Sequence, residues 1–159
     1  MPTVLLKKKH YKQELSASCV AAAARMLLDY HGVFDVSEAE LRRLLKTKPR
    51  GTNLFNLLFL RDEKRWQLDV EIDEGTSSEL FAALSLKKIP VIVSVDTAPF
   101  PHWEEAASHV VLVMGYDEEN VIINEPFFNE GEIKIPIANF LTAWGLNENY
   151  MVLIKKKTA

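Results

Sequence analysis

The chain of 159 residues has the length of one ordinary domain, with 48% hydrophobic and 26% charged residues, a balance that excludes a disordered or fibrous protein. Its formal net charge of -3 is small, and its two lysine runs, residues 7–9 and 155–157, lack the aromatic and groove-reading motifs of nucleic-acid binding. We therefore expect a single domain over residues 1–159 without a nucleic-acid partner.

The first half of the chain is predicted to be mainly helical. A segment rich in Ala and Leu, which Ser16 or Ser18 can cap and a His-Gly pair can end, predicts a helix over residues 19–30. A capping box that begins at Ser37 predicts a second helix. Two further helices are predicted over residues 52–63 and 77–88, with a short strand at 67–72 between them.

The second half of the chain is predicted to be mainly strands. β-Branched runs separated by turns predict strands at 89–95, 109–116, 121–124, 132–135 and 150–154, with a short helix at 137–144. Because the strands are joined by hairpin-like turns, we expect an α+β fold with a helical N-terminal half packed on a mainly antiparallel sheet. A long loop precedes the 109–116 strand, and loops of that length are usually functional or mobile.

Cys19 lies in the first turn of the first predicted helix. Backbone N–H groups there have no intrahelical partner, and the helix dipole favours a thiolate, which is the nucleophilic form of cysteine. The alternative is a buried cysteine that acts as a small apolar filler. Gln13 lies six residues upstream, so its amide can return beside the sulfur and donate to a developing oxyanion together with the Cys19 backbone N–H.

His109 opens the most apolar predicted strand and is a candidate general base, because the strand would hold its backbone rigid at the edge of a cleft. The next strand ends at Asn124 and Glu125, and antiparallel pairing would bring one of them level with His109 to orient the ring. Together with Cys19 and Gln13, these residues are the parts needed for thiol acyl transfer.

Two stretches resemble a known family. The run QELSASCVAAAARMLLDYHG resembles the opening motif of the bacteriocin-processing, double-glycine leader peptidases and their stand-alone relatives, a branch of the papain-like cysteine peptidases. The later run SHVVLVMGYDEENVIINEP resembles their second block, in which a His opens a strand and an Asn-Asp-Pro or Asp-Pro follows.

This resemblance implies a papain-like fold with Cys19 as nucleophile, His109 as base, Gln13 as oxyanion donor and position 125 as orienter of the base. Glu125 departs from the usual Asp, so either its longer side chain reaches the ring or Asn124 takes that role. The expected function is a cysteine peptidase or related thiol amide hydrolase with a peptide or protein substrate.

Two other functions use the same fold. One is a peptide-binding module that has lost turnover, and the other is an acyltransferase that passes the thioester to an amine instead of water. A zinc site from the His and Glu residues between 102 and 109 is disfavoured, because their spacing fits neither a helical His pair nor a tight loop site. The six glycines never form a phosphate-binding loop, so no cofactor is predicted.

Aromatic residues are expected near the site. Phe100 and Trp103 of the long loop are candidates for one wall of a cleft, whereas Trp144 is expected in the core. The single cysteine implies no disulfide and no oxidising compartment. The N-terminus lacks the order of a secretory signal, and no stretch reaches the about 20 apolar residues of a membrane span, so a cytoplasmic location is expected.

Overall fold

Seven strands form one antiparallel sheet with helices on both faces in the computed structural model, which describes residues 3–7 and 9–157. The order along the sheet is β2-β7-β3-β4-β5-β6, and β1 pairs with β4. The strands are β1 (Val4–Leu5), β2 (Leu68–Glu74), β3 (Val91–Asp96), β4 (Ser108–Tyr116), β5 (Asn120–Asn124), β6 (Glu132–Pro136) and β7 (Tyr150–Lys156). The predicted α+β class with an antiparallel sheet is confirmed.

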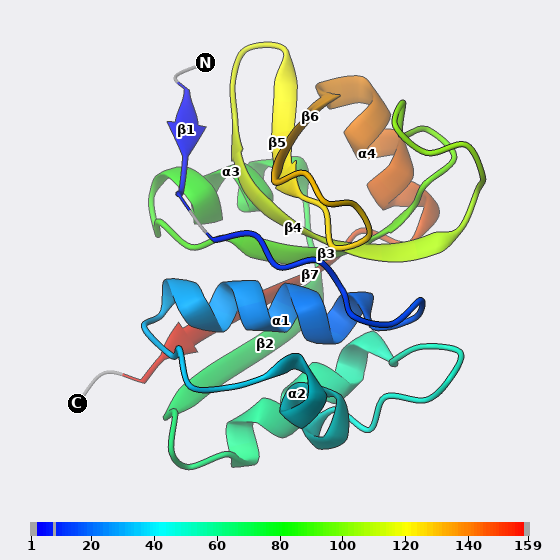
Figure 1. The fold of residues 1–159 in the computed structure, drawn as a ribbon. Coiled ribbons are helices and arrows are strands. Elements are labelled where there is room, and N and C mark those ends of the chain that lie inside the picture. The colour runs from blue at the N-terminus through cyan, green and yellow to red at the C-terminus, as the bar shows by residue number, and fades with distance from the viewer. Residues whose placement is uncertain (1–2, 8, 158–159) are drawn as a thin grey trace.

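The helices divide between the two faces of the sheet. Figure 1 shows α1 and α2 on one side of β3 and β4, and α4 on the other. They are α1 (Cys19–Tyr30), α2 (Glu38–Leu44), the 3-10 helix η1 (Leu54–Asp62), α3 (Ser77–Ser85) and α4 (Ile137–Leu146). The bounds predicted for the first helix are confirmed, whereas the third predicted helix is of the tighter 3-10 type. Within the described residues, no helix is long and apolar enough to cross a bilayer.

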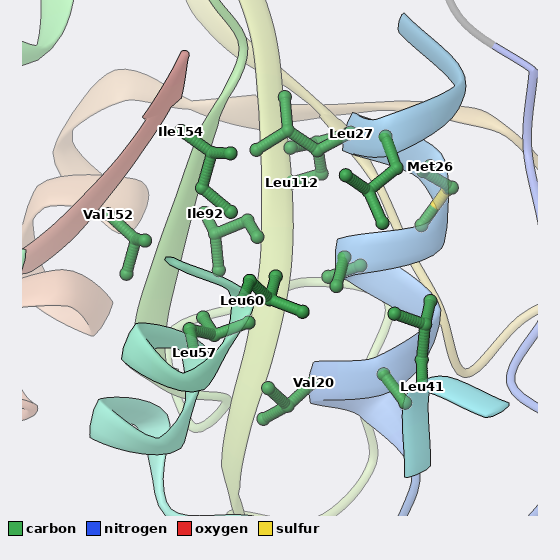
Figure 2. Packing of buried hydrophobic residues seen from close by; sticks show 14 of the residues in the cluster. Val20, Met26, Leu27, Leu41, Leu57, Leu60, Ile92, Leu112, Val152 and Ile154 are labelled. Atoms are coloured by element: carbon green, nitrogen blue, oxygen red, sulfur yellow. The ribbon is translucent and has the colours of Figure 1, made fainter. Parts of the chain in front are cut away.

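A hydrophobic cluster lies on each face of the sheet, and one of the two fixes α1 in place. On one face, Val20 and Leu27 of α1 pack against Ile92, Leu112 and Val152 of the three central strands (Figure 2). Alternate residues of the same strands point to the other face, where they pack against α3 and α4. Each fully buried aliphatic side chain of this kind contributes about 1.5–3 kcal/mol. This packing holds the first turn of α1 beside the start of β4.

The short strand β1, which was not predicted, lies against β4 where only a glycine fits. A Cβ built on Gly115 would come within 2.0 Å of the Val4 carbonyl oxygen and 2.9 Å of the Leu5 Cα. Both atoms are backbone, so the strand itself must move. We expect Gly115→Ala to lower the free energy of unfolding by about 2 kcal/mol. Urea titration followed by circular dichroism measures this change.

Gly145 provides a matched control, because it lies within α4 and an added Cβ would have no neighbour nearer than Asn149 Oδ1 at 3.7 Å. Gly145→Ala is expected to raise the unfolding free energy by about 0.5–1 kcal/mol through helix propensity. Equal stability of Gly115→Ala and the wild type would contradict the close approach of β1.

Candidate active site

Cys19 is the first residue of α1, and its side chain is half-buried. Ser18 occupies the N-cap position without capping the helix, so the predicted side-chain cap is wrong. Its hydroxyl instead accepts from the Leu15 N–H at 3.0 Å, and its single proton has Leu15 O and Glu38 Oε1, each at 3.1 Å, as alternative acceptors. No serine side chain therefore competes for the free N–H groups beside the sulfur, and the positive end of the helix dipole remains directed at it.

His109 is the second residue of β4, and only 5% of it is exposed. Its Nε2 forms a short hydrogen bond with Glu125 Oε1, which leaves Nδ1 as the nitrogen that can face Cys19. Burial alone would lower the pKa of His109. Hydrogen bonds to Cys19 and Glu125 and the charges of both groups outweigh burial and raise the His109 pKa to about 9. The structure thus brings the predicted nucleophile, base and orienter together.

Glu125 is completely buried, yet its carboxylate is surrounded by donors. Oε2 accepts from His102 Nε2 at 3.0 Å and Trp103 Nε1 at 3.1 Å, while Oε1 accepts from the Phe127 N–H at 3.1 Å in addition to His109. Burial raises the pKa of this carboxyl, but the hydrogen bonds from His102, His109 and Trp103 outweigh it and hold the Glu125 pKa at about 2. Glu125 is therefore held as an anion in contact with the His109 ring.

A β-bulge decides which strand-end residue reaches His109. The bulge shifts the pairing of β4 with β5, so Asn124, the last residue of β5, lies opposite Leu112. The same register extended by one residue past the end of β5 would set Glu125 opposite Val111. Val111 and His109 are two residues apart on one strand and share a face. The prediction that Asn124 or Glu125 would lie directly opposite His109 is therefore not met. The Glu125 side chain is long enough to reach the His109 ring from its position further along the strand pair. The Asn124 side chain lies on the other face, and its buried Nδ2 has no hydrogen-bond partner among the described residues.

Gln13 lies before α1 and is buried, with 7% of it exposed. Its Nε2 donates to Leu15 O at 2.9 Å and to Ser16 O at 3.0 Å, so both amide protons are used by the loop that leads to Cys19. Gln13 does not line the cleft described below. Donation to an oxyanion requires one of these two hydrogen bonds to exchange for the substrate.

A cleft of about 630 Å³ opens onto Cys19 and His109. Its walls come from the start of α1, the loop between α2 and η1, and the loop between β3 and β4, which lie at one end of the molecule (Figure 1). Trp103 lines the cleft as predicted, whereas Phe100 does not, because it is buried with α4 in the core. Trp144 also lies in that core, and its Nε1 donates to Tyr150 O at 2.9 Å.

The long loop contributes two residues whose roles the sequence did not reveal. Neither His102 nor Trp103 was predicted to contact position 125, yet both donate to Glu125. Sequence spacing alone has no signal for a contact between residues more than twenty positions apart, with two strands between them. No group of three or more His, Cys, Asp or Glu residues in the described chain is arranged to hold a metal ion.

Comparison with known proteins places the chain in a family. Residues 7–159 match the Peptidase C39 family. Comparison with curated proteins gives no significant match.

Solved structures share the fold at low identity. A C39-like peptidase from Bacillus anthracis is 17% identical, with 100% of both chains covered and a TM-score of 0.77. A double-glycine motif protease of an AMS/PCAT transporter, in complex with its leader peptide, is 19% identical over 99% of this chain and 100% of that one, with a TM-score of 0.73.

A third solved structure, that of a cysteine protease, extends this likeness. The Carica candamarcensis cysteine protease is 14% identical over 99% of this chain and 100% of that one, with a TM-score of 0.68. The family model matches nearly the whole chain. The antiparallel sheet and the helix that begins at Cys19 are consistent with that match. The chain belongs to the Peptidase C39 family of cysteine peptidases and has the papain-like fold.

Proposed function

We propose that this chain hydrolyses peptide bonds with Cys19 as nucleophile, His109 as general base and Glu125 as the residue that orients the base. The observation that carries the proposal is the position of His109 between the Cys19 thiol and the Glu125 carboxylate. A raised pKa keeps the imidazole protonated near neutral pH, and an imidazolium beside a thiol stabilises the thiolate.

The reaction follows from these positions. The Cys19 thiolate attacks the scissile carbonyl carbon, and the carbonyl oxygen becomes an oxyanion. The Cys19 backbone N–H donates to that oxygen, and Gln13 supplies the second donor once its amide leaves Leu15 or Ser16. His109 then gives its proton to the leaving amine as the C–N bond breaks.

Hydrolysis of the thioester completes the cycle. A water molecule loses a proton to His109 and attacks the acyl carbon, and the Cys19 sulfur leaves as a thiolate. Glu125 stays ionised throughout, because three side-chain donors stabilise its charge. It holds Nε2 of the ring, so that Nδ1 carries the proton to and from the reacting atoms. The substrate we propose is a peptide or protein segment that lies in the cleft beside Trp103.

A peptide-binding module without turnover is the second candidate. It is favoured by one observation, the engagement of both Gln13 amide protons by backbone carbonyls. In that case the cleft would hold a peptide without cleaving it. An oxyanion formed by attack of Cys19 would have only the Cys19 backbone N–H as donor, which disfavours the attack. The peptidase is expected to have a reactive Cys19 thiolate and to cleave peptides, whereas the binding module is expected to bind peptides without cleaving them.

Alkylation of Cys19 with iodoacetamide tests the proposed function. At pH 6 a free cysteine is almost entirely a thiol, so a Cys19 paired with imidazolium should react at least about tenfold faster than glutathione. His109→Gln should remove this advantage. His31→Gln, at the far end of α1, is the matched control and should leave the rate unchanged. A slow rate that does not depend on His109 would contradict the proposed ion pair.

A further inference from the structure

The cleft that contains Cys19 and His109 has a positively charged rim. Lys48 and Arg50 line it, and no Asp or Glu does so among the described residues. Both side chains are exposed, and neither forms an ion pair within the part of the chain that the structure describes. Their charges are therefore available to a ligand.

A compact turn holds these two cations at the rim. The Lys48 N–H donates to Gly51 O at 3.0 Å, and the Gly51 N–H donates to Lys48 O at 2.9 Å. Gly51 has a φ of 125°, which favours glycine, and Thr47 and Thr52 bond through their hydroxyls at 2.6 Å across the base of the turn. Arg50 lies within this closed turn, so the backbones that carry both charges have little freedom.

The positive charge continues beyond the cleft. A second hollow of about 610 Å³ is lined by Arg42, Arg43 and Lys48, again without an acidic residue among the described ones. It shares Lys48, Ser16 and Ala17 with the first cleft, so the two hollows adjoin, and together they are called the groove below. The Arg42 charge is already paired with Glu38 and Glu14, as the salt bridges show, whereas Lys48 and Arg43 are not ion-paired in the described chain.

We infer that the peptide which occupies this groove carries acidic side chains within a few residues of the scissile bond. The inference rests on the proposed function, because it assumes that a peptide is presented to Cys19. A groove without acidic residues in a chain of net charge -3 is an uneven distribution of charge. A positively charged groove raises the local concentration of an anionic ligand and excludes a cationic one.

Two alkylating reagents of the same size measure the charge directly. Iodoacetate is an anion and iodoacetamide is neutral, and each reacts by displacement of iodide as the Cys19 sulfur bonds to its methylene carbon. The ratio of the iodoacetate rate to the iodoacetamide rate is expected to fall about fivefold in Lys48→Gln/Arg50→Gln at low ionic strength. The difference in this ratio between the wild type and Lys48→Gln/Arg50→Gln should nearly vanish in about 1 M salt, where the Debye length is about 3 Å.

Arg61→Gln/Lys64→Gln is the matched control, because these residues line a separate hollow and the double variant removes the same charge. It should leave the ratio unchanged. A ratio that is equal in the wild type and in Lys48→Gln/Arg50→Gln would overturn the inference. Slow iodoacetamide alkylation of the wild type would instead count against the proposed thiolate, so the two failures are distinguishable.

Peptides show whether the charge selects a substrate. We expect a library of matched peptide pairs that differ only by Glu or Gln near the cleavage site to be cut about five- to tenfold faster in the Glu form. Lys48→Gln/Arg50→Gln should abolish this preference. The same library retained on Cys19→Ala reports binding without chemistry, so an acidic preference there supports the groove even in a protein that does not cleave. Equal retention and equal cleavage of the Glu and Gln forms would overturn the inference.

Discussion

Cys19→Ala is expected to lower kcat/KM for peptide cleavage by at least about 10⁴-fold. No other cysteine exists in the chain, and alanine cannot form the thioester, so only uncatalysed attack by water remains. The fold should tolerate the change, because Cys19 is only half-buried at the start of α1 and alanine keeps its Cβ in contact with the core. Cleavage of a synthetic peptide followed by mass spectrometry measures the loss.

Two controls separate chemistry from folding. The melting temperature of Cys19→Ala should stay close to that of the wild type, and peptides should still bind to it. Cys19→Ser keeps a hydroxyl in place of the thiol, but it should be nearly as inactive, because the imidazolium of His109 stabilises a thiolate and not an alkoxide. Cleavage by Cys19→Ala at the wild-type rate would show that the nucleophile lies elsewhere.

Local sequence patterns were enough to locate most of the elements. The Ala- and Leu-rich run after Ser18 gave the bounds of α1, because helix periodicity and a terminal glycine act within a few residues of the chain. The β-branched runs predicted β3 to β7 for the same reason. Cys19 and His109 could be proposed as nucleophile and base because one begins a helix and the other lies at the start of a strand. Such positions are readable without knowledge of the tertiary fold.

Features that depend on pairing between distant segments were not predictable in this way. Strand β1 has only two residues and exists because Gly115 lets it approach β4. The choice between Asn124 and Glu125 depends on the β-bulge in β4, which changes the face on which each side chain lies. No signal in the sequence marks the bulge, so both residues remained candidates until the register was known.

The loop between β3 and β4 shows the same limit. The position of His102 in the sequence predicts no contact with Glu125, although tertiary folding brings it to that carboxylate. Gln13 shows the reverse case, because its spacing from Cys19 predicted an oxyanion donor while the local turn engages its amide. Sequence spacing predicts which groups can come near the sulfur, but the hydrogen-bond partners depend on the whole fold.

Glu125→Gln is expected to lower kcat/KM at pH 7 by about 10²- to 10⁴-fold, the second largest effect we predict. Three side chains, those of His102, Trp103 and His109, donate to this carboxylate. The glutamine amide has a single acceptor oxygen for these three donors. Its NH₂ group is itself a donor, so it cannot accept from the donors that the second carboxylate oxygen had satisfied. His109 then loses both its negative partner and its fixed orientation, while the volume of the buried side chain is nearly unchanged.

The pH profile separates this role from a merely structural one. The His109 pKa is raised to about 9, so the imidazolium that stabilises the thiolate persists as pH rises until it is lost near pH 9. Removal of the Glu125 charge lowers the His109 pKa, so the alkaline limb of kcat/KM should move to lower pH in Glu125→Gln. Glu125→Asp restores the charge on a shorter side chain. It should recover part of the lost kcat/KM and move the alkaline limb part of the way back toward pH 9. If the limb stays in place in Glu125→Gln while only stability falls, the carboxylate holds the loop of His102 and Trp103 and does not tune the base.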